Sequence, residues 1–293
     1  MPAAAERARP VTGHGLGTTV GILHPGSMGA AVGAQLRARG ICVLWLPEGR
    51  SRTTVERAEA AGLEAVDGLP LLLERADVLL SLCPPAAAED VARQVAAQGF
   101  PGKTYVEANA VAPARIRRIR ELLPDATVVD GAVIGSPPLG GKQPRLYLAG
   151  RSSALDLLGD LFAPTDVRVH PLGEELGKAS TLKLAYSSYQ KTSRVLAAVA
   201  FGLAQTNGVG DELLDVARLR PGSYLPETGY IPKSAARAWR WGPELEEAAA
   251  LLHEAGLPDE LMRASAAVLT RWDTARGSEP SIEEALSLLM DDH

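Results

Sequence analysis

The chain has 293 residues, of which 46% are hydrophobic and 22% are charged, and its formal net charge is -5. This balance is typical of a soluble globular protein, and the length allows one large domain or two ordinary ones. The negative charge balance excludes a broad basic field that would hold a nucleic-acid backbone. No apolar run reaches the roughly 20 residues that a membrane-spanning helix needs. We therefore expect neither nucleic acid nor a membrane as a partner.

The N-terminal stretch Met1–Gly17 is rich in Ala, Arg and Gly and lacks the apolar core of a signal peptide, so we interpret it as a disordered leader. The two cysteines, Cys42 and Cys83, lie in apolar, strand-like runs. They are expected to be buried free thiols of a cytoplasmic protein rather than a disulfide. No His or Cys spacing resembles a metal site, so no metal is expected.

Up to about residue 170, apolar runs alternate with helical stretches. Strands are predicted at Thr19–Leu23, Cys42–Leu46, Val78–Cys83, Thr104–Glu107, Thr127–Val129, Arg145–Ala149 and Val167–His170, with helices such as Arg52–Ala61, Ala86–Gln98 and Ala114–Leu123 between them. This alternation indicates βαβ units and a mainly parallel sheet. The predicted fold is therefore a doubly wound α/β domain of the Rossmann type over residues 18–172.

After Gly173 the strand signal stops. A long helix is predicted over Glu174–Gln205, with Asn207-Gly208 as its end signal. Shorter helices are expected at Asp211–Arg218, Ser234–Arg240, Pro243–Ala255, Pro258–Thr274 and Ile282–Met290. Residues 173–293 thus form an all-helical domain. A helix of ~30 largely apolar residues must be buried on most sides, so we expect a homodimer through this domain.

The segment from Thr18 to Gly29 is the strongest motif in the chain. An apolar run ends in the turn His24-Pro25-Gly26-Ser27-Met28-Gly29, and a helical stretch follows. A strand, a glycine turn and a helix in this order predict a dinucleotide-binding loop, because the helix N-terminus attracts a pyrophosphate. In the G-x-G-x-x-G pattern His24 occupies the place of the first glycine, so a plain βα connection remains an alternative.

The residues after the second predicted strand choose between the two nicotinamide cofactors. Arg50, Ser51 and Arg52 favour a 2′-phosphate, which arginine binds through two charged hydrogen bonds. Glu48 points the other way, toward an unphosphorylated ribose. We therefore predict NADP(H), with NAD(H) as the alternative. Cys83 and Pro84, at the end of the strand Val78–Cys83, are also predicted to bind the cofactor.

Four separated segments resemble one family. They are the turn His24–Gly29, the stretch Glu107-Ala108-Asn109-Ala110-Val111-Ala112-Pro113, the loop Asp130–Ser136 after a strand, and Gly177–Ser187 with its lysines. Their order and spacing resemble the β-hydroxyacid dehydrogenase and 6-phosphogluconate dehydrogenase-like superfamily. The stretch Ala238–Glu244, followed by Gly256-Leu257-Pro258, is similar to the branch with a distinctive C-terminal helical domain.

The resemblance implies a Rossmann domain, a helical domain and a dimer. It also implies hydride exchange between NAD(P) and a small acid, with a lysine as general acid or base. By position this lysine is Lys183. Asn109 stands where the family has a substrate-binding serine, and it also counts among the predicted cofactor contacts. Tyr186 and Ser187 replace the asparagines that commonly follow the lysine.

Lys183 also stands out on physical grounds. A lysine within a strongly apolar helix is unfavourable unless it is paired or functional, and burial lowers its pKa toward neutrality. Tyr186, Ser187 and Gln190 lie at helical spacing from it and form one polar stripe, together with Arg194. A solvated stripe on an amphipathic helix is the alternative interpretation. Lys191 is the reserve candidate for the catalytic lysine.

Several further residues have a structural alternative to a role in the site. Gly135, Ser136, Gln190 and Lys191 are predicted to contact the substrate. For Gly135 and Ser136 the alternative is a plain loop with the following prolines. Tyr224 and Tyr230 either close the substrate pocket or pack in the core or at the surface. Trp239 and Trp241 are interpreted as packing anchors.

Three functions follow from these residues. The first is an NADPH-dependent oxidoreductase acting on a small carbonyl or hydroxy-acid substrate. The second is a C=N (imine) reductase on the same fold. The third is a non-catalytic, dinucleotide-binding sensor.

Overall fold

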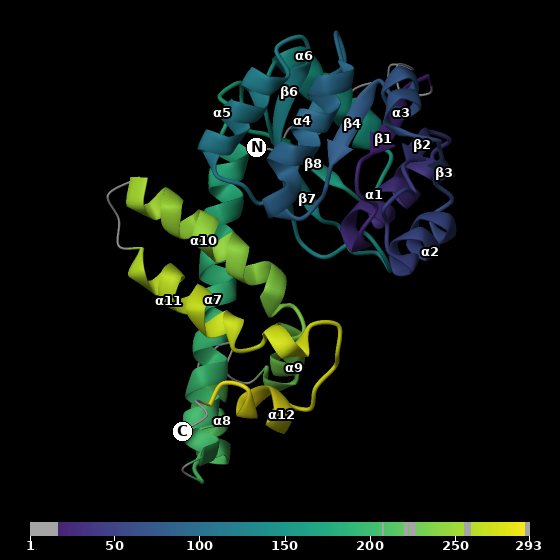
Figure 1. Cartoon of the computed structure of the whole chain (residues 1–293). Helices are drawn as coiled ribbons and strands as arrows, with labels where there is room; N and C mark the ends of the chain where they lie inside the picture. The colour runs from purple at the N-terminus through teal and green to yellow at the C-terminus, as the bar shows by residue number, and fades with distance from the viewer. Residues whose placement is uncertain (1–16, 207, 220–221, 223–226, 255–258, 291–293) are drawn as a thin grey trace, which may run out of the picture. The chain divides into compact units, whose positions relative to one another are not determined.

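The computed structural model describes residues 17–206, 208–219, 222, 227–254 and 259–290. These form two compact units (Figure 1). The first unit runs to Ala179, except that Pro84–Ala86 and Ala110–Pro113 belong to the second unit with Ser180 and the residues after it. The predicted boundary at residues 172 and 173 stays a prediction. The leader Met1–Gly17 lies outside the described residues except for its last glycine.

The first unit contains one eight-stranded sheet in the order β3-β2-β1-β4-β5-β6-β7-β8. The strands are β1 (Thr19–Ile22), β2 (Cys42–Trp45), β3 (Glu64–Ala65), β4 (Val78–Ser81), β5 (Thr104–Glu107), β6 (Thr127–Ile134), β7 (Arg145–Ala149) and β8 (Arg168–Pro171). All neighbours pair in parallel except β6 and β7. The chain reverses its winding direction between β1 and β4, as in a doubly wound sheet. The predicted Rossmann-type fold is confirmed.

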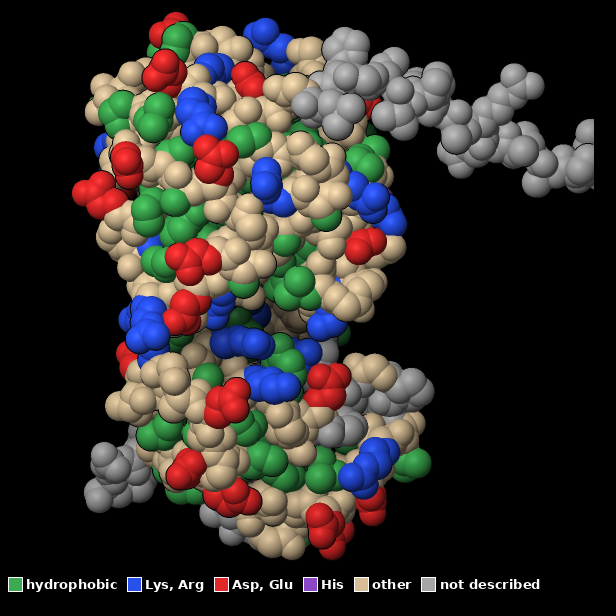
Figure 2. All heavy atoms as spheres, turned by 90° about the vertical axis from the view of Figure 1, so that its right-hand side faces the viewer, with side chains coloured by type: hydrophobic (Ala, Val, Ile, Leu, Met, Phe, Trp, Pro, Cys, Tyr) green, Lys and Arg blue, Asp and Glu red, His purple; other side chains and the backbone are tan. Residues whose placement is uncertain are grey.

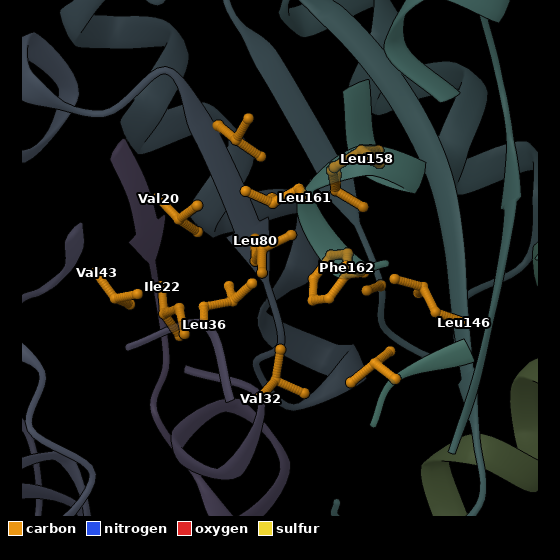
Figure 3. Close-up of a cluster of buried hydrophobic side chains, with 14 of the residues drawn as sticks. Val20, Ile22, Val32, Leu36, Val43, Leu80, Leu146, Leu158, Leu161 and Phe162 are labelled. Atoms are coloured by element: carbon orange, nitrogen blue, oxygen red, sulfur yellow. The ribbon is translucent and has the colours of Figure 1, made fainter. Parts of the chain in front are cut away.

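The helices of this unit are α1 (Ser27–Arg37), α2 (Arg52–Ala60), α3 (Leu69–Arg75), α4 (Ala88–Gln98), α5 (Pro113–Leu122) and α6 (Ser152–Phe162). Side chains of α1 and α6 pack against those of the strands in one buried cluster (Figure 3). Ile22 and Leu80 come from the strands, Leu36 from α1, and Phe162 from α6. Each is at most 2% exposed, so this core holds the strand ends and α1 in place.

One predicted strand was too short. The interpretation of Asp130–Ser136 as a loop is wrong for Asp130–Ile134, which continue β6 and pair with Arg145–Ala149 of β7. On the other side of β6, a Cβ at Gly131 would lie 3.1 Å from Val106 of β5, so glycine allows β6 to lie close to that strand. The glycine therefore marks close packing within the sheet rather than a turn.

The second unit is helical. Its helices are α7 (Lys178–Thr206), α8 (Gly210–Arg218), α9 (Ile231–Ala235), α10 (Ala238–Glu254), α11 (Glu260–Thr270) and α12 (Ile282–Ser287). The first two residues of α7 precede the unit boundary at Ser180. The helix of 29 residues confirms the predicted long helix. Its end signal includes Asn207, which lies outside the described residues.

The predicted break before Pro243 is wrong, because α10 continues through this proline. Trp241 and Leu245, on either side of it, are 6% and 0% exposed, and their burial outweighs the local preference of proline. Trp241 thus packs in the core, as predicted. Trp239 lies under the guanidinium of Arg276, 4.1 Å from its ring centroid.

Both cysteines are free, with Cys83 buried and Cys42 partly buried. Acidic and basic side chains are interspersed over the face of the first unit in view in Figure 2. Within the described ranges, no helix has the length and apolar character needed to cross a membrane.

Candidate functional site

The turn between β1 and α1 has the geometry predicted for a dinucleotide-binding loop. Among the described residues only glycines adopt a positive φ, so His24 makes the turn in an ordinary backbone conformation. Its carbonyl accepts a hydrogen bond from the Gly26 N–H at 2.8 Å. Pro25 is buried, Ser27 is exposed, and Met28 packs against the core. The missing first glycine therefore does not prevent the turn from forming.

Gly26 and Gly29 have different roles in this turn. A Cβ on Gly29 would lie 2.6 Å from the His24 carbonyl oxygen and 3.3 Å from Ile22, so glycine is needed for α1 to approach β1. A Cβ on Gly26 would meet only the His24 ring, at 3.8 Å. Gly26 is the N-cap of α1 and supplies no side-chain cap. The first N–H groups of α1 are therefore suited to an anion approaching the backbone.

Arg50 follows β2, and its side chain reaches back to this turn. Nη1 lies 2.8 Å from Nδ1 of His24, and Nη2 donates to the Leu23 carbonyl oxygen at 2.8 Å. The Nε–H is buried and has no hydrogen-bond partner in the described part of the chain. Burial, and then the charge of Arg50, lower the pKa of His24. Arg50 thus stands at the carboxyl ends of β1 and β2, where a Rossmann-type sheet receives the adenosine ribose.

The other two residues predicted to recognise the ribose belong to the start of α2. Ser51 is the N-cap, and its hydroxyl accepts a backbone hydrogen bond from the first turn at 3.3 Å. The side chain of Arg52 is 92% exposed and pairs with Glu56, one turn along, at 2.8 Å. The structure therefore brings Arg50, rather than Arg52, to the turn.

A buried polar cluster lies at the carboxyl ends of β4 and β5. The side-chain amide of Asn109 donates to Oε1 of Glu107, to Oγ of Ser81 at 3.1 Å and to Sγ of Cys83 at 3.3 Å. Burial raises the pKa of Glu107 to about 7, although hydrogen bonds from the backbone and the side chain of Asn109 and from Ser81 oppose the shift. Burial, and then Glu107, raise the pKa of Cys83 to about 11, so this thiol stays protonated at neutral pH.

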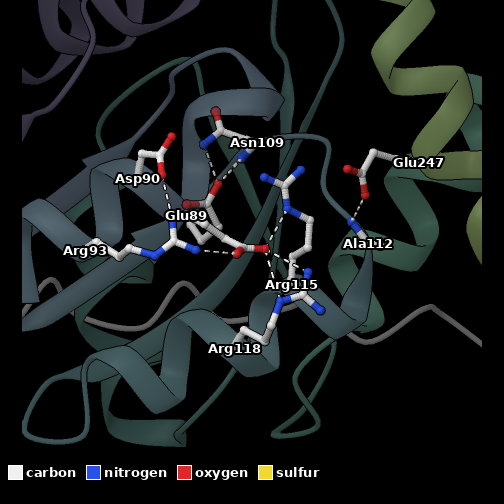
Figure 4. Close-up of polar contacts among 9 residues, drawn as sticks. Glu89, Asp90, Arg93, Asn109, Ala112, Arg115, Arg118 and Glu247 are labelled. Carbon is white, nitrogen blue, oxygen red and sulfur yellow. Dashed lines mark hydrogen bonds and ion pairs between the residues drawn. The ribbon is translucent and has the colours of Figure 1, made fainter.

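The cluster fixes the orientation of the Asn109 amide. Its nitrogen donates to the Glu107 carboxylate, because an oxygen in that place would be repelled, so the amide oxygen is on the other side of the group. Asn109 is labelled in Figure 4. Glu107 begins the stretch Glu107–Pro113 of the family resemblance, but the sequence did not predict it as a site residue. The sequence feature that could have identified Glu107 is a carboxylate at the end of an apolar strand. Pro84, the neighbour of Cys83, is exposed and belongs to the second unit.

Charged side chains join α4 to α5 beside this cluster. Glu89 accepts hydrogen bonds from Arg115 at 3.0 Å, from Arg118 at 2.7 Å and from Arg93 at 3.1 Å (Figure 4). Burial has the larger effect on the pKa of Glu107, and the positive charge of Arg115 opposes the rise. In the second unit, the Ala112 N–H donates to Glu247 at 3.1 Å.

The loop after β6 holds the predicted substrate residues Gly135 and Ser136, which are both exposed. Gly135 has a φ of +123°, which favours glycine.

Upstream, Oδ2 of the buried Asp130 accepts hydrogen bonds from the Gly177 and Ala179 N–H groups at 2.8 and 2.9 Å. Asp130 therefore secures the start of α7 from 47 residues away. The predicted start at Glu174 was too early.

The predicted catalytic lysine belongs to a basic cluster in the second unit. Burial, and then Arg240 on α10, lower the pKa of Lys183 to about 8. Burial, and then Arg237, lower the pKa of Arg240 itself. An ammonium group with a pKa of about 8 exchanges its proton near neutral pH, which suits a general acid or base.

Lys191, the reserve candidate, lies two turns further along α7. It is buried and forms an ion pair with the buried Glu244 of α10. Its Nζ lies 5.9 Å from the ring centroid of Trp241. This pairing joins α7 to α10, which is a structural role. Glu244 and Arg240 were missed as members of the cluster, because only packing brings α10 against α7.

The predicted polar stripe on α7 lies across the border between buried and exposed faces. Ser187 is 2% exposed and Tyr186 is 42% exposed, with Gln190 in between. Arg194 pairs with Glu227 at 2.9 Å, and its guanidinium lies 3.7 Å from the ring centroid of Tyr230. Tyr224 lies outside the described residues. Among the residues that the structure describes, no group of three or more His, Cys, Asp or Glu side chains could hold a metal ion.

Known proteins resemble both the sequence and the fold. Residues 204–272 match the model of a family described as a domain of unknown function, DUF1932. An uncharacterized 28.5 kDa protein in the 7S RNA 5′ region of Methanothermus fervidus is 28% identical over 169 residues, which are 58% of this chain. The match spans 64% of that relative's length.

Two solved structures share the architecture over nearly their whole length. The 3-hydroxyisobutyrate dehydrogenase of Mycobacterium tuberculosis, solved with L-serine, has a TM-score of 0.73 at 19% identity, covering 94% of this chain and 99% of its own. The reductive aminase of Aspergillus terreus, in complex with NADPH and ethyl-5-oxohexanoate, has a TM-score of 0.58 at 20% identity, with coverage of 93% and 99%.

The chain therefore shares the fold of these two solved structures, with a Rossmann-type sheet followed by a helical region. This is the fold that the sequence resemblance predicted.

Proposed function

We propose that the chain is an NADPH-dependent oxidoreductase that interconverts a small carbonyl compound and the corresponding alcohol or hydroxy acid. The observation that carries the proposal is the place of Lys183 on the long helix α7, where the family resemblance expects a catalytic lysine. Burial and the charge of Arg240, which lower its pKa to about 8, support this role. The shared fold with a 3-hydroxyisobutyrate dehydrogenase and an NADPH-bound reductive aminase supports the same class of activity.

The residues of the β1–α1 turn fit the cofactor. The uncapped N-terminus of α1 and the open space at Gly26 suit a pyrophosphate. The buried, unpartnered Nε–H of Arg50 suits the 2′-phosphate, which favours NADP(H) over NAD(H). NADPH supplies the hydride when it is bound.

The chain's own residues handle the proton and the orientation of the substrate. In reduction Lys183 gives a proton from Nζ to the substrate oxygen, and in oxidation Nζ takes it back. Asn109 orients the reactants through its amide oxygen, because its amide nitrogen is engaged by Glu107. We further propose that the protein acts in the cytoplasm as a homodimer through its helical region. Its two free cysteines support a reducing compartment.

Two measurements test this function. Fluorescence titration with NADPH and, separately, with NADH should show tighter binding of NADPH. Loss of NADPH absorbance in the presence of small oxo acids and ketones should then report turnover. Lys183→Ala should abolish turnover and leave NADPH binding intact, whereas the exposed Lys178→Ala should leave both unchanged. Cofactor binding without any Lys183-dependent turnover would favour a sensor instead.

Reduction of a C=N bond is the second candidate, because the chain shares its fold with a reductive aminase. A competition assay separates the two reactions. Under the leading proposal, a ketone alone is reduced, and adding an amine does not increase the loss of NADPH. An increase that depends on the amine would favour imine reduction.

A further inference from the structure

We propose that His24 is a positioning residue that holds Arg50 in place to bind the 2′-phosphate of the dinucleotide cofactor. The proposal rests on the proposed use of NADPH. It gives a function to the one residue that departs from the glycine pattern of the turn.

The guanidinium of Arg50 is anchored at two points and retains donors for a third group. A guanidinium has five N–H donors. One on Nη1 reaches Nδ1 of His24 and one on Nη2 reaches the Leu23 carbonyl oxygen, each at 2.8 Å. The Nε–H is buried and has no partner in the described part of the chain. An anion bound to the remaining donors would satisfy it.

The contact with Arg50 also fixes the protonation of His24. Arginine only donates, so Nδ1 of His24 must accept, and the ring proton must lie on Nε2. The imidazole is therefore neutral and adds no charge of its own to the turn. Burial and Arg50 both lower the pKa of His24, which supports this state.

A glycine at position 24 would leave Arg50 with the Leu23 carbonyl as its anchor from the turn. A guanidinium held by two acceptors at fixed positions loses less conformational freedom on binding a phosphate. Arg52 provides the contrast, because its side chain is 92% exposed and pairs within its own helix. The structure therefore assigns the specificity for the 2′-phosphate to the pair His24 and Arg50.

The test uses 2′,5′-ADP and 5′-AMP as probes, because they differ only in the 2′-phosphate. Isothermal titration of the full chain would compare the wild type with His24→Leu, His24→Asn and Arg50→Ala. Arg52→Ala is the matched control. Asparagine places an acceptor oxygen near the position of Nδ1, whereas leucine has no acceptor.

The expected result is a selective loss of affinity for the probe that carries the 2′-phosphate. Arg50→Ala and His24→Leu should each weaken binding of 2′,5′-ADP by about tenfold or more while 5′-AMP binding changes little. His24→Asn should restore most of the loss, and Arg52→Ala should have no effect. An equal loss for both probes in His24→Leu would overturn the proposal, since it would indicate a damaged turn. The proposal would also be overturned if His24→Leu kept full affinity for 2′,5′-ADP while Arg50→Ala lost it. Failure of the wild type to bind either probe would instead count against the dinucleotide cofactor itself.

Discussion

The side-chain amide of Asn109 donates a hydrogen bond to the carboxylate of Glu107, two residues earlier at the end of β5. Glu107 is completely buried, and burial raises its pKa to about 7. The pair therefore places a carboxyl group that titrates near neutral pH next to a residue predicted to orient the substrate. This relationship has consequences for stability as well as for the site.

Stability should fall as the pH rises through the range in which Glu107 ionises. Its folded pKa of about 7 exceeds the unfolded value of 4.5, so the native state binds more protons between these two values. The contribution of Glu107 to the free energy of unfolding is on the order of 3 kcal/mol. It is fully present below pH ~4.5 and is lost as the pH rises through ~7.

Glu107→Gln mimics the neutral acid and should remove this pH dependence. Urea unfolding at pH 5 and at pH 8 should show the variant gaining stability relative to the wild type at the higher pH. Glu121→Gln, at an exposed position on α5, is the control. Parallel pH profiles for the wild type and Glu107→Gln would contradict the buried carboxyl as the source.

The reaction itself should titrate with Lys183. Reduction needs the protonated amine, so its rate should fall as the pH rises through about 8, and oxidation should show the opposite trend. Arg240→Gln removes a positive charge that lowers this pKa, so both midpoints should move to higher pH. Profiles of kcat against pH measure the shift, with Arg117→Gln as a control on an exposed helix face. Unchanged midpoints in Arg240→Gln would contradict the prediction that the charge of Arg240 lowers the pKa of the catalytic group.

The ion pair of Lys191 and Glu244 should matter for folding more than for the reaction. Glu244→Gln leaves a buried ammonium without its partner, which should lower the free energy of unfolding by about 3–5 kcal/mol. The double variant Lys191→Met and Glu244→Leu should recover most of that loss. Urea unfolding at neutral pH measures all three proteins. A loss below about 1 kcal/mol in Glu244→Gln would show that the pair is dispensable.

The two glycines of the turn should separate folding from binding. Gly29→Ala places a Cβ 2.6 Å from a backbone carbonyl and should cost about 1–3 kcal/mol of stability. Gly26→Ala meets only the His24 ring at 3.8 Å, so its stability should stay within about 0.5 kcal/mol of the wild type. We expect Gly26→Ala to weaken NADPH binding nevertheless, because the methyl group occupies the approach of the phosphate. Thermal unfolding and an NADPH titration of the same samples distinguish the two effects.

Residues close together in the sequence determined the order of the elements. Apolar runs between helical stretches predicted the α/β sheet, and the glycine turn after β1 predicted the start of α1, because strand and helix periodicity are local properties. The 29-residue helix α7 was evident for the same reason. Lys183 was also recognisable in the sequence as a cation within an apolar helix.

Tertiary packing decided what the candidate residues do. Asp130 bonds to the N-terminus of α7 from 47 residues away, and Glu244 neutralises Lys191 from another helix. The pKa values of Glu107 and Lys183 depend on burial, which the residue types alone do not specify. Arg50 and Arg52 look equivalent in the sequence, and only the folded chain turns Arg50 toward His24. Contacts between distant segments carry this information, because burial and charge act through space rather than along the chain.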